Sequence, residues 1–182
     1  RRNPPVDLDT YGRLDFGLVR LDKYFEYEAQ GLMARYKFVY PGSERSVSVI
    51  TSRGCPYHCS FCSIHLHAGH NFRRHSVDYV LSQLADLVNT YGVRHVHIED
   101  DNMSLDRRRF TEILRGIIER NLAITWDAPN GIHVHTLDRD LLELMRDSGC
   151  TYAVVGVESG VQEVLDKVIR KESVRIPEVI KI

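Results

Sequence analysis

The chain has 182 residues, of which 43% are hydrophobic, so it is long enough for one domain with a substantial core. Its 24 Lys and Arg residues nearly balance its 25 Asp and Glu residues, for a formal net charge of -1. This balance gives no sign of nucleic-acid binding by charge, and no stretch is long and apolar enough for a transmembrane helix.

Residues 1–45 show no regular hydrophobic period, and we expect them to form a linker or N-terminal extension. Pro4 and Pro5 favour extended backbone, and a short strand is predicted at 36–40, before a turn at 41–43. The first residues lack the apolar segment of a secretory signal, and free cysteines fit a reducing compartment. We therefore expect a cytoplasmic location. Because the chain lacks an initiator Met, we also expect it to be a piece of a longer or processed protein.

A strand–helix rhythm begins at residue 46. Apolar, β-branched runs predict four strands, at 47–51, 93–99, 123–127 and 152–157. Helical spacing predicts a helix after each strand. The first helix is expected at 77–91, with Ser76 as N-cap and Gly92 as stop, and the second helix after an N-cap at Ser104. The third helix is expected at 138–148 before Gly149, and the fourth from Ser159 onward.

Four successive strand–helix units predict an α/β fold of parallel strands covered by helices. In such folds the active site lies at the carboxyl ends of the strands. Polar residues follow every predicted strand: a cysteine loop, then Glu99-Asp100-Asp101, then residues 127–130, then Glu158-Ser159-Gly160. The second strand also carries His95 and His97, which could reach substrate inside a barrel or be hydrogen-bonded core histidines.

The cysteine loop has the spacing C-x3-C-x2-C, with Cys55, Cys59 and Cys62 directly after the first strand. Thiolates are the usual ligands of iron–sulfur clusters, normally four per cluster. Three on one loop would leave one iron open to another ligand. The fourth cysteine, Cys150, lies far along the chain and is expected to be a buried, small apolar side chain.

Two other interpretations of these cysteines stay open at this point. A structural zinc site could combine them with histidines of the same loop, because zinc accepts mixed Cys/His ligand sets. The cysteines could also be structural residues without a metal. The histidines concerned are His58, His65, His67 and His70.

The cysteine spacing, with the aromatic Phe61 directly before the last cysteine, resembles that of the radical S-adenosylmethionine (SAM) superfamily. The resemblance covers roughly residues 47–171 and is closest to the branch whose members carry a cobalamin-binding domain upstream. The matching segments are 54–62, 97–102, 129–131, 141–150 and 156–160.

The resemblance implies that Cys55, Cys59 and Cys62 hold a 4Fe-4S cluster whose open iron binds SAM. Reductive cleavage of SAM would then yield methionine and a 5′-deoxyadenosyl radical for methylation, rearrangement or cyclisation of an unidentified small molecule. It also implies an electron donor of the flavodoxin or ferredoxin type, while no catalytic residue is assigned. The alternatives are a methylthiotransferase-like radical SAM enzyme and a non-catalytic zinc or iron–sulfur module.

The resemblance also suggests contacts to SAM. Phe61 would lie near the adenine, and Asp100 or Asp101 would accept from the ammonium group. Glu158 would accept from the ribose hydroxyls or the ammonium, and Asn130 would shape the mouth of the pocket. The competing interpretations are a solvated acidic loop for the aspartates, an ion pair for Glu158 and a simple turn for Asn130.

A complete radical SAM core has six strand–helix units, whereas this chain supplies about four. We therefore expect a partial (β/α) barrel over residues 46–182, truncated at the C-terminal side, with weak activity alone. Cobalamin is possible in the full-length protein but is not expected to bind to this fragment.

Overall fold

The computed structural model describes residues 7–30, 45–171 and 173–181. The strand predicted at 36–40, the turn at 41–43 and the Pro4-Pro5 segment lie outside these residues. Within the described part, no helix combines the length and apolarity that a membrane span requires.

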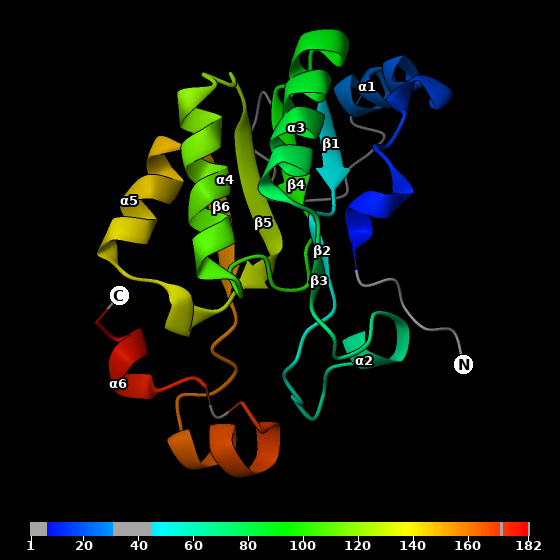
Figure 1. Ribbon diagram of the computed structural model, residues 1–182. Helices are drawn as coiled ribbons and strands as arrows, with labels where there is room; N and C mark the ends of the chain where they lie inside the picture. Colours follow the sequence, from blue (N-terminus) through cyan, green and yellow to red (C-terminus); the bar gives the residue numbers. More distant parts are fainter. Residues whose placement is uncertain (1–6, 31–44, 172, 182) are drawn as a thin grey trace.

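A four-stranded parallel sheet forms the centre of the molecule, in the order β1-β4-β5-β6. The strands are β1 (Ser46–Val49), β4 (His95–Ile98), β5 (Thr125–Ile132) and β6 (Cys150–Val155). Helices α3 (Val77–Tyr91), α4 (Arg107–Glu119) and α5 (Arg139–Asp147) connect them and lie side by side over one face of the sheet (Figure 1). The α/β fold with parallel strands and covering helices, predicted from the sequence, is confirmed.

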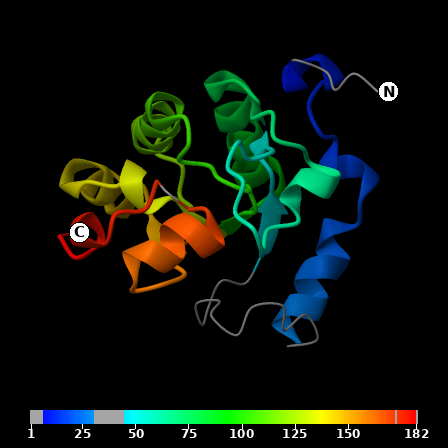
Figure 2. The same cartoon turned by 90° about the horizontal axis from the view of Figure 1, so that it is seen from below.

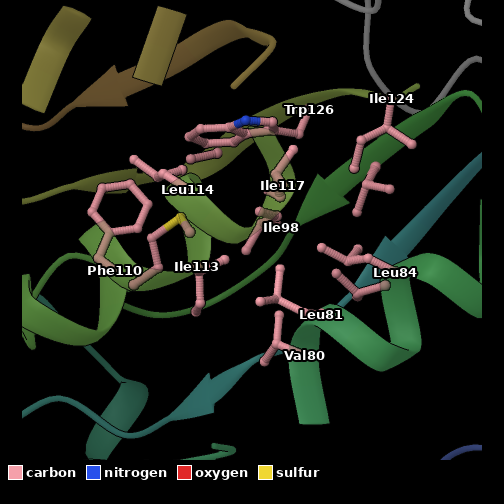
Figure 3. Close-up of a cluster of buried hydrophobic side chains, with 14 of the residues drawn as sticks. Val80, Leu81, Leu84, Ile98, Phe110, Ile113, Leu114, Ile117, Ile124 and Trp126 are labelled. Atoms are coloured by element: carbon pink, nitrogen blue, oxygen red, sulfur yellow. The ribbon is translucent and has the colours of Figure 1, made fainter. Parts of the chain in front are cut away.

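The main core lies between the sheet and these helices. Trp126 of β5 is fully buried, and its indole N–H donates to Ser148 Oγ at 3.2 Å. Gly116 lets α4 approach α3, because a Cβ there would lie only 2.2 Å from Leu81 Cδ1. Figure 3 shows the side chains that meet in this layer, among them Val80, Leu81 and Leu84 from α3, Phe110, Ile113, Leu114 and Ile117 from α4, and Ile98 and Trp126 from the strands.

The termini of α3 agree with the prediction. Ser76 Oγ accepts from the Tyr79 N–H at 3.1 Å, and Gly92 adopts the left-handed conformation at φ 65°. Gly149, at φ 92°, follows the end of α5 as predicted. These boundaries depend on local capping chemistry, which the sequence displays directly.

The predicted N-cap at Ser104 is wrong. Asp106 caps α4 instead, and its Oδ1 accepts from the Arg109 N–H at 3.1 Å. Ser104 is fully buried and accepts from the Thr136 hydroxyl at 2.8 Å and the His133 N–H at 3.3 Å. Its hydroxyl therefore joins the loop after β4 to the segment after β5.

Two other predicted boundaries also differ. The third strand continues to Ile132, through the predicted turn, because β5 keeps pairing with β6 across a register shift between Ala128 and Ile132. The last predicted helix does not begin at Ser159, whose Oγ accepts from the Val161 N–H at 3.1 Å. A π-helix follows later, over Val164–Ile169, before α6 (Ile176–Val179).

The described part of the N-terminal segment packs against the sheet domain. It contains 3-10 turns at Leu8–Tyr11 and Phe16–Leu18 and helix α1 (Leu21–Ala29). Phe25 of α1 joins the main core, and Glu28 Oε2 accepts from the Ser46 N–H at 2.9 Å. A domain boundary near residue 45 stays a prediction.

Candidate functional site

The cysteine loop lies at the carboxyl edge of the sheet. It leaves β2 (Ser52–Arg53), passes through the short helix α2 (Ile64–His67) and returns as β3 (Arg73–Arg74). Figure 2 views this edge, with α2 on one side, the red C-terminal helix α6 on the opposite side, and the orange π-helix between them. The site therefore occupies the place that parallel α/β folds reserve for ligands.

A two-stranded antiparallel ribbon closes the base of this loop, with Arg53 paired to Arg73. Gly54 then turns the chain at φ 85°, where a Cβ would lie 2.5 Å from the Asn71 carbonyl oxygen. The next amide, that of Cys55, donates to the Gly69 carbonyl at 3.3 Å. Only glycine fits at position 54, because it alone lacks the clashing Cβ and adopts this φ without strain.

All four cysteines lie in the described part of the chain and are free and half-buried. Burial raises the pKa of the Cys55 thiol, and charge on Cys59 and Cys62 raises this pKa further. Burial also raises the pKa of Cys59, whereas the ammonium of Lys171 lowers it. The three loop thiols thus interact with one another, and a positive group stands beside them. This arrangement suits a metal centre that is held by thiolates.

Cys150 is separate from this group. It begins β6, packs at the margin of the main core, and its thiol lies 3.8 Å from the Tyr152 carbonyl oxygen. Burial raises the pKa of this thiol to about 11. Cys150 therefore stays protonated at neutral pH, but it is half-buried and not buried as predicted.

The predicted acidic contacts after β4 differ in their surroundings. Asp100 is 2% exposed and accepts from the Thr51 N–H, from the Thr51 hydroxyl at 2.6 Å and from the Ser52 hydroxyl at 2.6 Å. Burial raises its pKa despite these hydrogen bonds. Asp101, half-buried, accepts from the Gly54 N–H at 2.9 Å. Asp100 thus joins the chain that follows β1 to the chain that follows β4, while Asp101 binds the backbone at the start of the cysteine loop.

Glu99, which the sequence interpretation did not select, links three strands. Its Oε1 accepts from the Ser48 hydroxyl at 3.2 Å, and its Oε2 accepts from Asn130 Nδ2 at 3.2 Å. Asn130 Nδ2 also donates to the Glu99 carbonyl at 3.0 Å. Asn130 therefore lies at the mouth of the sheet's carboxyl edge, held by the end of β4.

Glu158 is linked to the cysteine loop by Lys171. Its Oε1 accepts from Lys171 Nζ at 3.2 Å, and both charges influence the Cys59 thiol. Ser60 holds the π-helix against the loop, because its N–H donates to the Ile169 carbonyl at 2.9 Å and its hydroxyl donates to the Val168 carbonyl at 2.8 Å. The predicted site residue Phe61 is 61% exposed on the same loop.

Sequence reasoning missed a chain of polar rings beside the cysteines. The Tyr57 hydroxyl lies 3.3 Å from His135 Nε2, His135 Nδ1 contacts His133 Nδ1, and His133 Nε2 lies 3.1 Å from Ser173 Oγ. Burial lowers the pKa of His133 to about 3. The only sequence signal is the His-Val-His triplet at 133–135, which repeats the one at 95–97.

The family model described as "Radical SAM superfamily" matches residues 49–181. The chain belongs to the radical SAM superfamily. Among curated relatives, it is 36% identical over 151 residues to cytidylyl-2-hydroxyethylphosphonate methyltransferase of Streptomyces wedmorensis, covering 83% of this chain and 27% of that protein. It is 26% identical over 145 residues to anaerobic magnesium-protoporphyrin IX monomethyl ester cyclase of Rubrivivax gelatinosus, covering 79% of this chain and 26% of that protein. The chain thus spans about a quarter of these relatives.

Solved radical SAM structures share the fold. TsrM from Kitasatospora setae, a radical SAM methyltransferase with cobalamin and a 4Fe-4S cluster bound, has a TM-score of 0.63 at 23% identity, covering 74% of this chain and 27% of that one. OxsB, a cobalamin-dependent SAM radical enzyme with aqua-cobalamin and SAM bound, has a TM-score of 0.63 at 21% identity, covering 74% and 21%. These matches support the partial barrel architecture of the radical SAM core.

Proposed function

We propose that this chain is the catalytic-core segment of a radical SAM enzyme, with Cys55, Cys59 and Cys62 holding a 4Fe-4S cluster that leaves one iron for SAM. The observation that carries the proposal is the ribbon-closed loop of three free, interacting thiols at the carboxyl edge of the sheet. When bound and reduced, the cluster would supply the electron that cleaves SAM to methionine and a 5′-deoxyadenosyl radical. The chain's own groups would bind and orient SAM.

The spacing of possible ligand atoms favours a cluster over a single zinc ion. Within the part of the chain that the structure describes, the thiols do not belong to any set of three side chains whose ligand atoms all lie within 4.8 Å of one another. One tetrahedral zinc would need such a set, whereas a cubane distributes its ligands over several iron atoms. The loop histidines contact each other instead, with the His58 and His70 ring centroids 4.1 Å apart and the two rings tilted by 32°.

Two carboxylates are the proposed contacts for SAM. We propose Asp101 for the ammonium group, because Asp100 is buried and accepts three hydrogen bonds from Thr51 and Ser52. Asp100 would act by positioning the loop. Glu158, beside Lys171, is proposed for the ribose hydroxyls or the ammonium.

Two further groups complete the proposed SAM pocket. Phe61 is exposed on the cysteine loop, where its ring is available to the adenine. Asn130, fixed by Glu99, would line the entrance from β5. The structure assigns no catalytic residue for the substrate reaction.

The reaction class is proposed from the relatives. They include methyltransferases and a cyclase, so we propose methylation, rearrangement or cyclisation of a small molecule, with cobalamin a possible cofactor of the whole protein. An electron donor of the flavodoxin or ferredoxin type and a reducing, cytoplasmic location belong to the same proposal. No observation favours the methylthiotransferase alternative.

Anaerobic reconstitution tests the proposal. We expect about four iron and four sulfide per chain, and reduction should make the protein convert SAM to methionine and 5′-deoxyadenosine. Zinc without sulfide would instead support the non-catalytic module. A loaded cluster that neither binds SAM nor cleaves it would limit the chain to cluster binding.

A further inference from the structure

A second group of possible metal ligands lies inside the sheet, apart from the cysteine loop. His95 and His97 alternate with Val96 and Ile98 along β4, and the two apolar residues face the helices. Asp127 alternates in the same way with Trp126 and Ala128 of β5. The two imidazoles and the carboxylate therefore share the face of the sheet opposite the helices. We call them the His–His–Asp triad.

The strand register brings the triad together. In the parallel pairing of β4 with β5, His97 is directly opposite Asp127, and His95 is opposite Thr125. His97 Nδ1 lies 3.0 Å from both oxygens of Asp127, and His95 Nε2 lies 3.3 Å from its Oδ2. All three ligand atoms lie within 4.8 Å of one another. Rigid strands, rather than loops, thus hold this geometry.

We propose that the triad binds a divalent first-row transition-metal ion, of which Zn²⁺ is the probe of choice. Histidine nitrogens and carboxylate oxygens bind zinc at about 2.0–2.2 Å, which places neighbouring ligand atoms about 3–3.5 Å apart. The separations of 3.0 and 3.3 Å to Asp127 meet this requirement. Two histidines and one carboxylate also leave coordination positions for water or another ligand.

The surroundings of His95 favour metal ligation. Its Nδ1 lies 2.7 Å from Thr125 Oγ1, which in turn donates to the Arg94 carbonyl at 3.4 Å. If Nδ1 carries the proton and donates to Thr125, Nε2 presents its lone pair toward Asp127 and the ion. Ligating histidines characteristically donate their second ring N–H to such a partner, which fixes the tautomer.

The surroundings of Asp127 also favour metal ligation. The Asp127 side chain is 7% exposed, and its described partners are the two imidazoles, with no lysine or arginine among them. A buried carboxylate beside two imidazole nitrogens matches the mixed nitrogen and oxygen ligand sets that bind divalent transition metals. The same atoms can also satisfy one another by hydrogen bonds without a metal, and the test must separate these two states.

The test uses the Cys55→Ser/Cys59→Ser/Cys62→Ser variant of this chain, so that the loop thiols cannot bind the probe. After incubation with Zn²⁺ and gel filtration, we expect about one zinc per chain and, with Co²⁺, visible d–d absorption from a site without thiolates. Adding His97→Gln or Asp127→Asn to this variant should abolish the binding of that one zinc ion per chain. His65→Gln, on the surface of the cysteine loop, is the matched control and should retain it.

A milder variant keeps the test decisive if the triad substitutions unfold the protein. Thr125→Val leaves all three ligands and removes only the partner of His95 Nδ1, so it should weaken Zn²⁺ binding about 10- to 100-fold. Three outcomes would each overturn the proposal. They are an absence of bound zinc in the triple Cys→Ser variant, bound zinc that persists in folded His97→Gln, and an unchanged Zn²⁺ affinity in Thr125→Val. None of these readouts depends on SAM chemistry.

Discussion

The backbone N–H of Gly54 donates to Asp101 Oδ2 at 2.9 Å, which joins the first residue of the cysteine loop to the acidic end of β4. The neighbouring carboxylate, Asp100, holds Thr51 and Ser52 just before this point. Two consecutive acidic residues thus fix the entry to the loop. The orientation of the cysteines depends on both, although only Asp101 lies next to the loop itself.

Gly54 is the most sensitive position of this entry. Gly54→Ala should abolish cluster loading, because its Cβ would lie 2.5 Å from the Asn71 carbonyl oxygen. Iron and sulfide per chain after anaerobic reconstitution measure the effect. Gly69→Ala is the matched control, since Gly69 has a similar φ of 77° but a Cβ there would have no neighbouring atom within 4 Å. Equal loss in both variants would show that backbone strain, and not the clash, decides loading.

The cysteine assignment has its own test. Cys55→Ala, Cys59→Ala and Cys62→Ala should each lose the cluster and its visible absorption, because a cubane held by two thiolates lacks one of its ligands. Cys150→Ala should retain both, since that thiol lies at the start of β6 and its pKa is raised to about 11. Loss of iron in Cys150→Ala equal to that in the loop variants would contradict the assignment.

SAM affinity should respond to Asp101 and Glu158. Each charged hydrogen bond contributes about 1.5–3 kcal/mol, so Asp101→Asn and Glu158→Gln should weaken binding about ten- to a hundredfold. Calorimetric titration of SAM into cluster-loaded protein measures this, with the exposed Asp147→Asn as control. Unchanged affinity in both site variants would remove these contacts from the proposal.

Asp100 should behave differently from Asp101. We expect Asp100→Asn to lower the free energy of unfolding by about 1–3 kcal/mol, because an amide cannot accept all the hydrogen bonds that Thr51 and Ser52 now donate. Chemical denaturation of the cluster-free protein measures the change. A fully stable Asp100→Asn variant with weakened SAM binding would instead assign Asp100 to the ligand.

His133 should make stability depend on pH. Its pKa is lowered by burial, and further by His135 and Lys171, from 6.5 to about 3. Between these two values the unfolded chain binds a proton that the native protein does not. The free energy of unfolding should therefore fall as the pH drops from about 6.5 toward 3, by up to about 1.4 kcal/mol per pH unit. Above a pH of about 6.5 His133 is neutral in both states, and the protein keeps the full stability that it loses at lower pH.

Replacing His133 isolates its contribution to the pH dependence of the free energy of unfolding. His133→Gln should show a shallower decline over this pH range, whereas His67→Gln, on exposed α2, should follow the wild type. Denaturation midpoints at a series of pH values provide the comparison. Identical slopes in wild type and His133→Gln would mean that native His133 titrates normally.

The contact between α3 and α4 gives a prediction about packing. Gly116→Ala gains about 1 kcal/mol in helix propensity, but its methyl would overlap Leu81, and overpacking costs about 1–3 kcal/mol. We expect a net loss of stability that Leu81→Ala partly relieves in the double variant. Gly160→Ala, where no atom lies within 4 Å, is the control. A stabilised Gly116→Ala variant would show that Leu81 moves aside freely.

Local signals explain what the sequence could predict. The boundaries of α3 follow from Ser76 and Gly92, whose capping roles depend on neighbours in the chain. The strand–helix order and the cysteine loop are likewise local patterns. The length of β5 was not predictable in this way, because Pro129 and Gly131 resemble turn residues and only pairing with β6 keeps the strand extended.

The site residues show the same division. Asp100 and Asp101 are adjacent and chemically identical, so nothing in the sequence tells which one meets the Thr51 hydroxyl. The contact between Tyr57 and His135 joins residues far apart in the chain, and it exists only after β5 has been placed beside the cysteine loop. Tertiary packing, and not local preference, decides these contacts.

The ribbon of β2 and β3 has a consequence for how a cluster could assemble. A free loop that gathers three thiolates must lose chain entropy as each one binds. Here the pairing of Arg53 with Arg73 already brings the loop ends together, before any ligand arrives. The first thiolate to bind would therefore raise the effective concentration of the other two, so the loop would fill cooperatively rather than one ligand at a time.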